Sequence, residues 1–329
     1  MAELLRTADR HQSVVKISGR PHIGDVAEGI AARLPGQWSV TVDVYSHPVW
    51  QEDLVPLLWD AGELAQAVQT ARIPCAAVLT DGADTELLLI ERPGHRQDYL
   101  VGAFAPEGFD DNYEEPHAPS SIVIPGTAQP AAHAITDRFL PAYHQAVPAR
   151  RIAVIASTLE RVREESEAWE AIKASGRYSD GRPLTAGVLP GAEEAFADLS
   201  WYAFCDVLHH ALAVLERCRP ADLVVPGEAV ALDRLAGALA RGEEVIADWN
   251  SRRITPRALP AESYADAKAE RDALMRPVIE TWLADGDAFL RQARAVTPAS
   301  PSAPSGQGRA LTGLPPALPA PPGSAPARR

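Results

Sequence analysis

The order of apolar and polar side chains divides the chain into a front half with strand patterns and a back half with helical patterns. Residues 38–46 alternate between the two kinds, which predicts a half-buried strand. Apolar side chains then recur at helical spacing over residues 51–72, and the apolar run at 75–80 predicts a second strand. The simplest interpretation is a strand–helix–strand unit with a right-handed crossover, in which the two strands lie parallel to each other.

The rest of the front half adds a hairpin, a short strand and two helices. The hairpin is predicted at 86–92 and 98–104, the short strand at 121–124, and the helices at 23–34 and 127–143. Pro141 is expected to kink or end the second helix, because proline lacks an amide proton and crowds the preceding turn. Together these elements predict an α+β domain with a mixed β-sheet and flanking helices.

From residue 150 onward the pattern is helical. Helices are predicted at about 152–173, 192–217, 228–247 and 263–296, the last interrupted at Pro277 and Gly286. In the first of them the apolar positions form one narrow seam that runs through Ser166 and Trp169 to Lys173, so this seam is expected to face a partner helix. We therefore expect an all-α helical bundle. A contiguous exposed apolar patch along the Trp169 seam would indicate an interaction surface.

These patterns predict two folded domains and a tail. The acidic α+β domain is expected over residues 1–149 and the helical domain over 150–296. Residues 297–329 contain nine prolines and no acidic residue, which predicts a disordered tail with polyproline character. Its PPALPAPP run resembles ligands of aromatic grooves such as those of SH3 folds, although the same composition also serves as a plain flexible spacer.

Charge and composition narrow the functional classes. The 329 residues carry 31 Lys and Arg against 44 Asp and Glu, a net charge of −13, and residues 1–149 hold 9 basic against 20 acidic residues. This charge argues against nucleic-acid binding, which needs a basic face. Three widely spaced cysteines, no signal-peptide pattern and no apolar run of membrane-spanning length predict a cytoplasmic protein without a membrane partner. Only three of the basic residues are lysines, a bias typical of a GC-rich bacterial genome.

Candidate catalytic residues follow from the expected parallel strands. His47 and Asp81 each come directly after a strand, so both would lie at the carboxyl edge of the sheet, where open α/β sheets bind ligands. A histidine oriented by a carboxylate is the minimal unit for general-base catalysis, because the imidazole titrates near neutral pH. The alternative is structural, with His47 in an exposed His–Pro turn and Asp81 in an Asp–Gly turn. The sequence offers no nucleophile to complete the catalytic set.

A second candidate site is the acidic segment at 107–117. A set of four carboxylates there offers the oxygen ligands that hard cations prefer: Asp110, Asp111, Glu114 and Glu115. Their spacing differs from the Asp-x-Asp-x-Asp-Gly pattern of a calcium loop, so the alternative is a solvated loop or a docking surface for basic residues. No cofactor is indicated, because the sequence contains no P-loop and no dinucleotide-binding glycine pattern.

Two further clusters could bind a ligand. Cys205 and His209 are four residues apart and would share a helix face as metal ligands. The same spacing separates Asp206 from His210, so these two side chains would also share a helix face. The second cluster is an arginine group at 252–257, which could hold a phosphate. Ordinary contacts within a helix and solvated arginines explain the same spacings.

The residues leave two functional classes open. We expect a non-enzymatic interaction or regulatory protein of a bacterial cytoplasm, whose acidic α+β domain recognises a protein partner and whose helical domain serves assembly. This expectation depends mainly on the absence of a complete catalytic set from a well-patterned sequence. The alternative is a small-molecule hydrolase or transferase with a site at the carboxyl edge of the sheet near His47 and Asp81. It requires a concave pocket bordered by these two residues.

Overall fold

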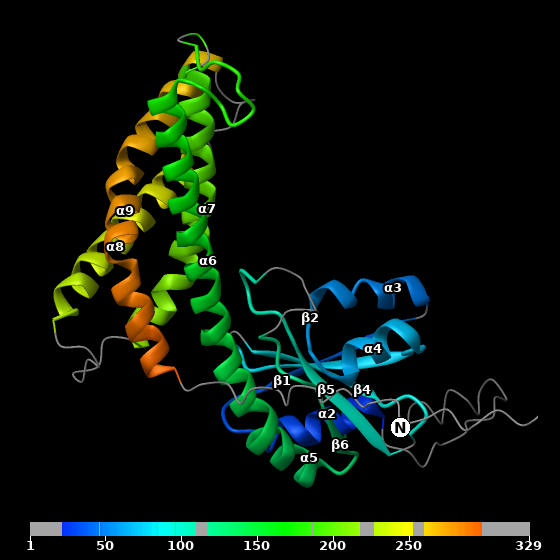
Figure 1. The fold of residues 1–329 in the computed structure, drawn as a ribbon. Coiled ribbons are helices and arrows are strands. Elements are labelled where there is room, and N and C mark those ends of the chain that lie inside the picture. Colours follow the sequence, from blue (N-terminus) through cyan, green and yellow to red (C-terminus); the bar gives the residue numbers. More distant parts are fainter. Residues whose placement is uncertain are drawn as a thin grey trace, which may run out of the picture.

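The computed structural model consists of a β-sheet with flanking helices, followed by a set of long helices (Figure 1). It describes residues 22–45, 47–83, 85–95, 97–109, 117–185, 187, 189–217, 227–252 and 260–297. The predicted fold class, an α+β region followed by a helical region, is confirmed. The predicted tail at 297–329 lies outside the described residues from position 298 onward.

The sheet has six described strands. They are β1 (Ser39–Val44), β2 (Leu58–Trp59), β3 (Cys75–Thr80), β4 (Glu86–Glu91), β5 (Asp98–Phe104) and β6 (Ile122–Pro125). Strands β1, β3, β4, β5 and β2 lie side by side in that order, and β6 also pairs with β5. The predicted hairpin is confirmed as β4 and β5. Each of these strand pairs is antiparallel, so the described sheet is antiparallel rather than mixed.

The expected parallel pairing of the first two strands is wrong. Strands β1 and β3 pair antiparallel, with Ser39 opposite Thr80 and Val44 opposite Cys75. The segment between them is not one crossover helix, because the chain first crosses to the far side of the sheet and contributes β2 there, next to β5. Pro56 and Gly62 interrupt the helical pattern on either side of this short strand. The apolar spacing at 51–72 thus reports burial of Leu58 and Trp59 in a strand, not one continuous helix.

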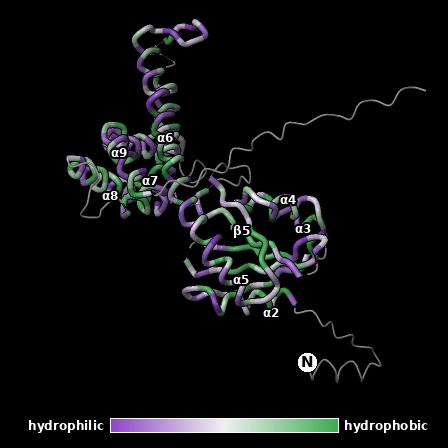
Figure 2. Tube along the Cα trace, turned by 60° about the horizontal axis from the view of Figure 1, so that its bottom comes forward, coloured by the Kyte–Doolittle hydropathy of each residue, from purple (hydrophilic) through white to green (hydrophobic). Residues whose placement is uncertain are grey.

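Helices cover both faces of the sheet. Helices α2 (Ile23–Ala31) and α5 (Ala128–Ala134) pack on one face, while α3 (Pro48–Glu52), the 3-10 turn η1 (Val55–Leu57) and α4 (Glu63–Thr70) cover the other. Strand β4 is buried on both faces. Leu87 and Leu89 pack on the side of α2 and α5, and Leu88 and Ile90 pack on the side of α4. A strand buried on both faces is apolar at every position instead of alternating. Figure 2 shows this hydrophobic band between the helices.

A single helical column leads from the sheet into the bundle. Helix α5 continues through the π-helical segment η2 (Ile135–Phe139) into α6 (Leu140–Ser175). Pro141 therefore does not end the helix, although the backbone departs from regular α-helical geometry directly before it, in η2. The widened π turn directly before it offers a physical reason, because it accommodates a residue that can neither donate a backbone hydrogen bond nor pack against a regular turn.

Helix α6 passes without a break through the predicted domain boundary at 149 and 150. Near this boundary the residues of α6 pass from one hydrophobic core to the other. Ala146 packs in the core of the sheet region, and Ile152 packs in the core of the bundle. The division into domains at 1–149 and 150–296 stays a prediction.

Three further helices complete the bundle, α7 (Leu189–Arg217), α8 (Ala229–Ser251) and α9 (Ala261–Val296). The expected interruptions of the last helix at Pro277 and Gly286 are absent, since α9 is continuous over both. Gly286 instead marks a close helix crossing, where an added Cβ would lie 2.7 Å from Cδ1 of Leu159 on α6. The bundle core is aromatic, and the rings of Trp282 and Phe289 meet edge to face at 5.3 Å.

The sheet region contacts the bundle through the loop that follows β5. The ring of Phe109 lies 5.6 Å from the ring of His210 on α7. His209, the next residue on α7, places Nε2 3.2 Å from the carbonyl oxygen of Glu107. These two histidines therefore join the sheet region to the bundle. Within the described ranges, no helix is both long enough and apolar enough to cross a membrane.

Candidate functional site

The structure does not bring His47 and Asp81 together. Because β1 and β3 are antiparallel, the end of β1 and the end of β3 lie at opposite edges of the sheet. His47 is the N-cap of α3, where its Nδ1 accepts a hydrogen bond from the amide of Val49 at 3.3 Å. Asp81 Oδ1 accepts hydrogen bonds from the amides of Ala83 at 2.8 Å and Thr85 at 3.2 Å. Both side chains thus have the local capping and turn roles that were the structural alternative.

The pKa of Asp81 reflects the same turn. Partial burial acts to raise it, but hydrogen bonds from Thr85 and Ala83 outweigh burial and hold the pKa of this carboxyl below its usual value. A carboxylate held ionised by its own turn is a poor proton acceptor. This electrostatic setting gives no support to general-base catalysis at Asp81.

The predicted cation site falls outside the described part of the chain. Asp110, Asp111, Glu114 and Glu115 all belong to the segment 110–116, so this site stays a prediction. Elsewhere, the described residues contain no group of three or more His, Cys, Asp or Glu side chains placed to hold a metal. Burial raises the pKa of the Cys205 thiol to about 11, which disfavours the thiolate that a metal would need.

The arginine group is only partly described. Arg252 Nη2 lies 2.8 Å from Asp248 Oδ2 and its Nη1 lies 3.2 Å from Glu270 Oε2, so this guanidinium is engaged by carboxylates. Arg253 and Arg257 lie outside the described residues. The phosphate site therefore gains no support from Arg252.

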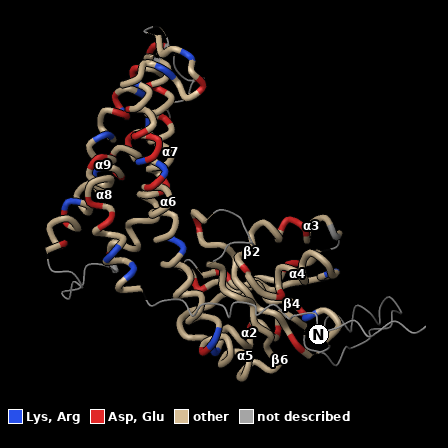
Figure 3. Tube along the Cα trace, in the orientation of Figure 1, with Lys and Arg blue, Asp and Glu red and all other residues tan. Residues whose placement is uncertain are grey.

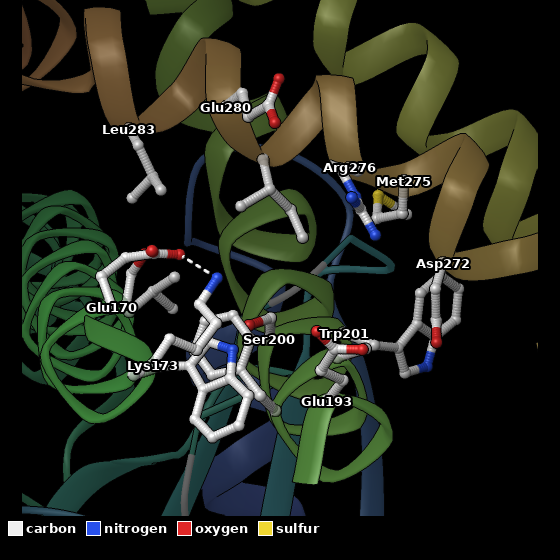
Figure 4. A pocket seen from close by; sticks show the side chains of 16 residues that line it. Glu170, Lys173, Glu193, Ser200, Trp201, Asp272, Met275, Arg276, Glu280 and Leu283 are labelled. Atoms are coloured by element: carbon white, nitrogen blue, oxygen red, sulfur yellow. Dashed lines mark ion pairs between the residues drawn. The ribbon is translucent and has the colours of Figure 1, made fainter. Parts of the chain in front are cut away.

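A groove of about 400 Å³ opens between helices α6, α7 and α9 (Figure 4). It lies on the part of the bundle farther from the sheet (Figure 1). Its apolar lining comes from all three helices: Val162, Trp169, Phe196, Ala197, Trp201, Met275, Ile279 and Leu283. The predicted seam on α6 leads into this groove, because Ser166, Trp169 and Lys173 also line it.

The seam changes character along α6. Ile155 and Leu159 are completely buried against the bundle core, as expected for a seam that faces partner helices. Beyond Val162 the seam is no longer fully covered, and Trp169 is only partly buried. Its ring stacks on Phe196 of α7, with centroids 6.4 Å apart and planes inclined by 18°. The groove thus presents two adjoining aromatic rings to solvent on a helical scaffold.

Carboxylates predominate around the groove. Glu170, Glu193, Asp272 and Glu280 face two cations, Lys173 and Arg276. Lys173 is paired with Glu170, and its Nζ also lies 5.9 Å from the centroid of the Trp169 ring. Among the described residues, Glu193 and Glu280 have no ion-pair partner. Figure 3 shows this mixture of charges continuing along the bundle helices. An acidic rim around an apolar floor favours an apolar ligand that carries positive charge.

A buried ion network fixes the groove from below. The guanidinium of Arg271 is sandwiched between two indoles, 4.4 Å from the centroid of Trp201 and 4.7 Å from that of Trp249. Its Nη2 donates hydrogen bonds to Asp198 at 2.8 Å and to Asp272 at 2.6 Å. Because Trp201 and Asp272 also line the groove, the network holds two of the lining side chains in place.

Lys268 extends the network to the first part of α7. Its Nζ donates to Glu194 Oε1 at 2.7 Å and also to Asp198. Burial acts to raise the pKa of Asp198, but hydrogen bonds from Lys268 and Arg271 and their charges outweigh it and lower the pKa. Burial likewise acts to lower the pKa of Lys268, and its two carboxylate partners raise it instead. The charges of Asp198 and Lys268 therefore persist at neutral pH, and their ion pair links α7 to α9.

The chemistry of the lining suits binding better than catalysis. Neither histidine nor cysteine lines the groove among the described residues, and its hydroxyls come from Ser166 and Ser200. A serine without a neighbouring base is not an activated nucleophile. The sequence indicated only the α6 side of this groove, through the spacing of Trp169. Phe196 and Met275 were missed because residues from different helices become neighbours only when the bundle forms.

Comparisons of the chain with protein-family models, with curated proteins and with solved structures give no match, so its function must be argued from this geometry alone.

Proposed function

We propose that this chain is a protein-interaction module whose helical region binds a basic, apolar peptide segment of a partner in the groove between α6, α7 and α9. The observation that carries the proposal is the stacked pair of Trp169 and Phe196, which are both only partly buried and line an open groove. Monomeric proteins bury large aromatic side chains where they can, and an accessible aromatic pair in a rimmed hollow is typical of an interaction site.

The energetics favour an aromatic anchor at this position. Truncation of a central aromatic residue of an interface costs about 2 kcal/mol or more, which corresponds to roughly a thirtyfold loss of affinity. The buried network of Arg271 and Lys268 supports the groove before any ligand arrives, which lowers the entropy cost of binding.

The acidic charge of the chain supports the choice of a basic partner. Glu193 and Glu280 supply carboxylates at the rim, and the whole chain carries a net charge of −13. Such a charge accelerates the approach of a basic ligand and repels an acidic one. The acidic front half, which the sequence assigns to partner recognition, contributes to this long-range attraction in the proposal. No arrangement of His47 and Asp81 favours the alternative of a hydrolase or transferase.

The test measures fluorescence anisotropy of a labelled synthetic peptide of leucine and lysine residues against the full chain. We expect binding with a Kd below about 100 μM and at least a tenfold weaker Kd for Trp169→Ala. Trp50→Ala is the matched control, because Trp50 is an exposed indole on α3 in the sheet region. This control variant should bind like the native chain.

A second peptide, in which glutamate replaces each lysine, tests the charge requirement. It should bind at least tenfold more weakly than the basic peptide, because the rim carboxylates repel it. Equal binding of the two peptides, or equal binding by the native and Trp169→Ala chains, would refute the proposed function.

A further inference from the structure

We infer that the groove is occupied in the free protein by the C-terminal segment of this same chain, residues 308–324, which a partner must displace. The inference rests on the proposed function, since it names the resident occupant of the same groove. It is carried by three features: the chemistry of the segment, its charge, and the distance between the end of α9 and the groove.

The segment has the composition that an aromatic groove binds. Residues 308–324 read GRALTGLPPALPAPPGS, in which Leu311, Leu314 and Leu318 alternate with proline-rich stretches. Proline-rich segments adopt an extended helix with three residues per turn, and they bind aromatic-lined grooves at a low entropy cost. Trp169 and Phe196 supply such an aromatic surface, and Met275 and Leu283 extend it along α9.

The charges of the segment and the groove are complementary. Residues 298–329 contain three arginines, Arg309, Arg328 and Arg329, and no acidic residue. At the groove, Glu170 is paired with Lys173 and Asp272 with the buried Arg271, whereas Glu193 and Glu280 have no ion-pair partner among the described residues. Arg309 lies two residues before Leu311, so it would be near the rim when the leucines contact the aromatic floor. A proline-rich segment with one arginine and no acidic residue thus complements an aromatic groove that carries two unpaired carboxylates.

The segment is long enough to reach the groove from its own chain. Arg276 in the groove precedes Val296 by 20 residues on α9, which corresponds to about 30 Å along a helix. Leu311 follows Thr297 by 14 residues, and 14 residues of polyproline helix span about 43 Å. The connection therefore exceeds the required length by a modest margin, which favours binding within one chain.

Attachment to the same chain strengthens a weak contact. A tether of this length gives an effective concentration of about 1 mM, so a segment whose free Kd is about 100 μM would fill the groove about nine-tenths of the time. A competing ligand of the same site then binds about tenfold more weakly to the native chain than to a chain whose tail cannot compete.

The first experiment measures this competition with a fluorescein-labelled synthetic peptide of residues 308–324. Its affinity is compared between the full chain and a full-length variant with the substitutions Leu311→Ser, Leu314→Ser and Leu318→Ser. We expect about tenfold tighter binding to the triple variant, and a loss of that binding when Trp169→Ala is added. Equal binding to both chains, or no binding to the triple variant, would overturn the inference.

The second experiment locates the segment directly. The photoreactive residue benzoylphenylalanine replaces Leu314 in the full chain, which is irradiated at about 1 μM, far below the effective concentration of about 1 mM for the tethered segment. We expect cross-links within one chain to the peptides that contain Trp169, Phe196 or Met275. Cross-linked dimers would assign the groove to the tail of a second copy, and cross-links elsewhere would place the tail outside the groove. Either result would overturn the inference.

The failure of this inference is distinguishable from the failure of the proposed function. If the basic leucine–lysine peptide binds the native and triple-variant chains equally and depends on Trp169, the groove binds partners but the tail does not occupy it. If that peptide binds neither chain, the proposed function itself fails.

Discussion

Single residues at the contact between sheet and bundle carry the most unusual electrostatics of the described chain. His210 is 2% exposed and faces Phe109. Burial, followed by the charges of His209, Arg151 and Arg150, lowers its pKa to about 4, while a hydrogen bond with the backbone of Gly108 acts weakly in the opposite direction. The imidazole is therefore neutral at physiological pH, and protonation would place a buried cation beside two arginines.

This setting predicts how folding stability depends on pH. The folded-state pKa lies below the ordinary value, so between about pH 6.5 and pH 4 the unfolded chain binds more protons than the folded one. The contribution of His210 to the free energy of unfolding is therefore fully present above pH 6.5. It falls by up to about 3 kcal/mol as the pH drops to 4. Urea unfolding of the native chain and of His210→Phe at pH 7.5, 5.5 and 4.5 checks this.

In His210→Phe, the free energy of unfolding should decline much less over this pH range than it does in the native chain. His133→Phe is the matched control, because the side chain of His133 is 78% exposed and pairs only with the nearby Asp137. If His210→Phe retains the pH dependence of the native chain, the assignment to His210 is wrong.

A second residue-scale prediction concerns Gly108, which precedes Phe109 in the same contact. Its φ is +80°, and an added Cβ would lie 2.1 Å from Nε2 of His209. Gly108→Ala should therefore destabilise the fold by more than about 2 kcal/mol, since backbone strain and a steric clash both contribute. Gly36→Ala is the control at a φ of +89°, where an added Cβ meets nothing within 4 Å.

Thermal unfolding of the two single variants separates these contributions. The control should lose only about 1 kcal/mol, the cost of the backbone conformation. Adding His209→Ala to Gly108→Ala should recover the difference between the two variants. Equal destabilisation by Gly108→Ala and Gly36→Ala would contradict the clash.

At the scale of elements, the network between α7 and α9 determines how firmly the groove is built. Arg271 is 4% exposed and carries a positive charge. Its guanidinium donates hydrogen bonds to two carboxylates and stacks between two indoles. Its removal would leave the partly buried Asp272 without its cation, and Asp198 with Lys268 alone. Such a loss is more costly than the absence of the whole pair would be.

Arg271→Ala should therefore destabilise the bundle by about 3 kcal/mol or more. Arg271→Lys should have an intermediate effect, because it keeps the charge but loses the planar fork and the stacking. Arg276→Ala is the control on the same helix, one turn further along and exposed, and should change stability by less than about 0.5 kcal/mol. Chemical denaturation followed by circular dichroism measures all three, and similar losses for Arg271→Ala and Arg276→Ala would refute the role of the network.

For the whole molecule, the main feature is that one helix joins two hydrophobic cores. The sheet core and the bundle core share no buried residue, although α6 contributes to both. The contact between them at Phe109 and His210 is small compared with either core. Two cores with a limited interface are expected to unfold separately.

This separation predicts how core variants respond to denaturant. Leu89→Ala should lower the stability of the sheet region, and Phe289→Ala that of the bundle, each by about 3 kcal/mol and with little effect on the other region. Hydrogen exchange followed by mass spectrometry distinguishes the two regions within one sample. Loss of protection in both regions for both variants would show a single cooperative unit and contradict the predicted domain division.

The sequence by itself determined most of the elements, but neither strand β2 nor the separation of α3 from α4. Apolar spacing located α2 and the four bundle helices, because burial of one side of a helix leaves a period in the sequence. The β4–β5 hairpin was located by two runs of β-forming residues on either side of a turn. The same spacing misled at 51–72, where residues of a helix, a turn and a strand are all buried and produce one apparent helical stripe. It also overestimated Pro141 and Pro277 as helix ends, since neighbouring packing maintains both helices.

The tertiary structure alone decided which elements are neighbours and in which direction they run. The antiparallel pairing of β1 with β3 separated His47 from Asp81, and the packing of α6 with α7 and α9 brought Trp169 to Phe196. A periodic pattern indicates that one face of an element is buried, but it does not identify the element that covers this face. For this reason the Trp169 seam was visible in the sequence, whereas the groove that it lines exists only in the folded bundle.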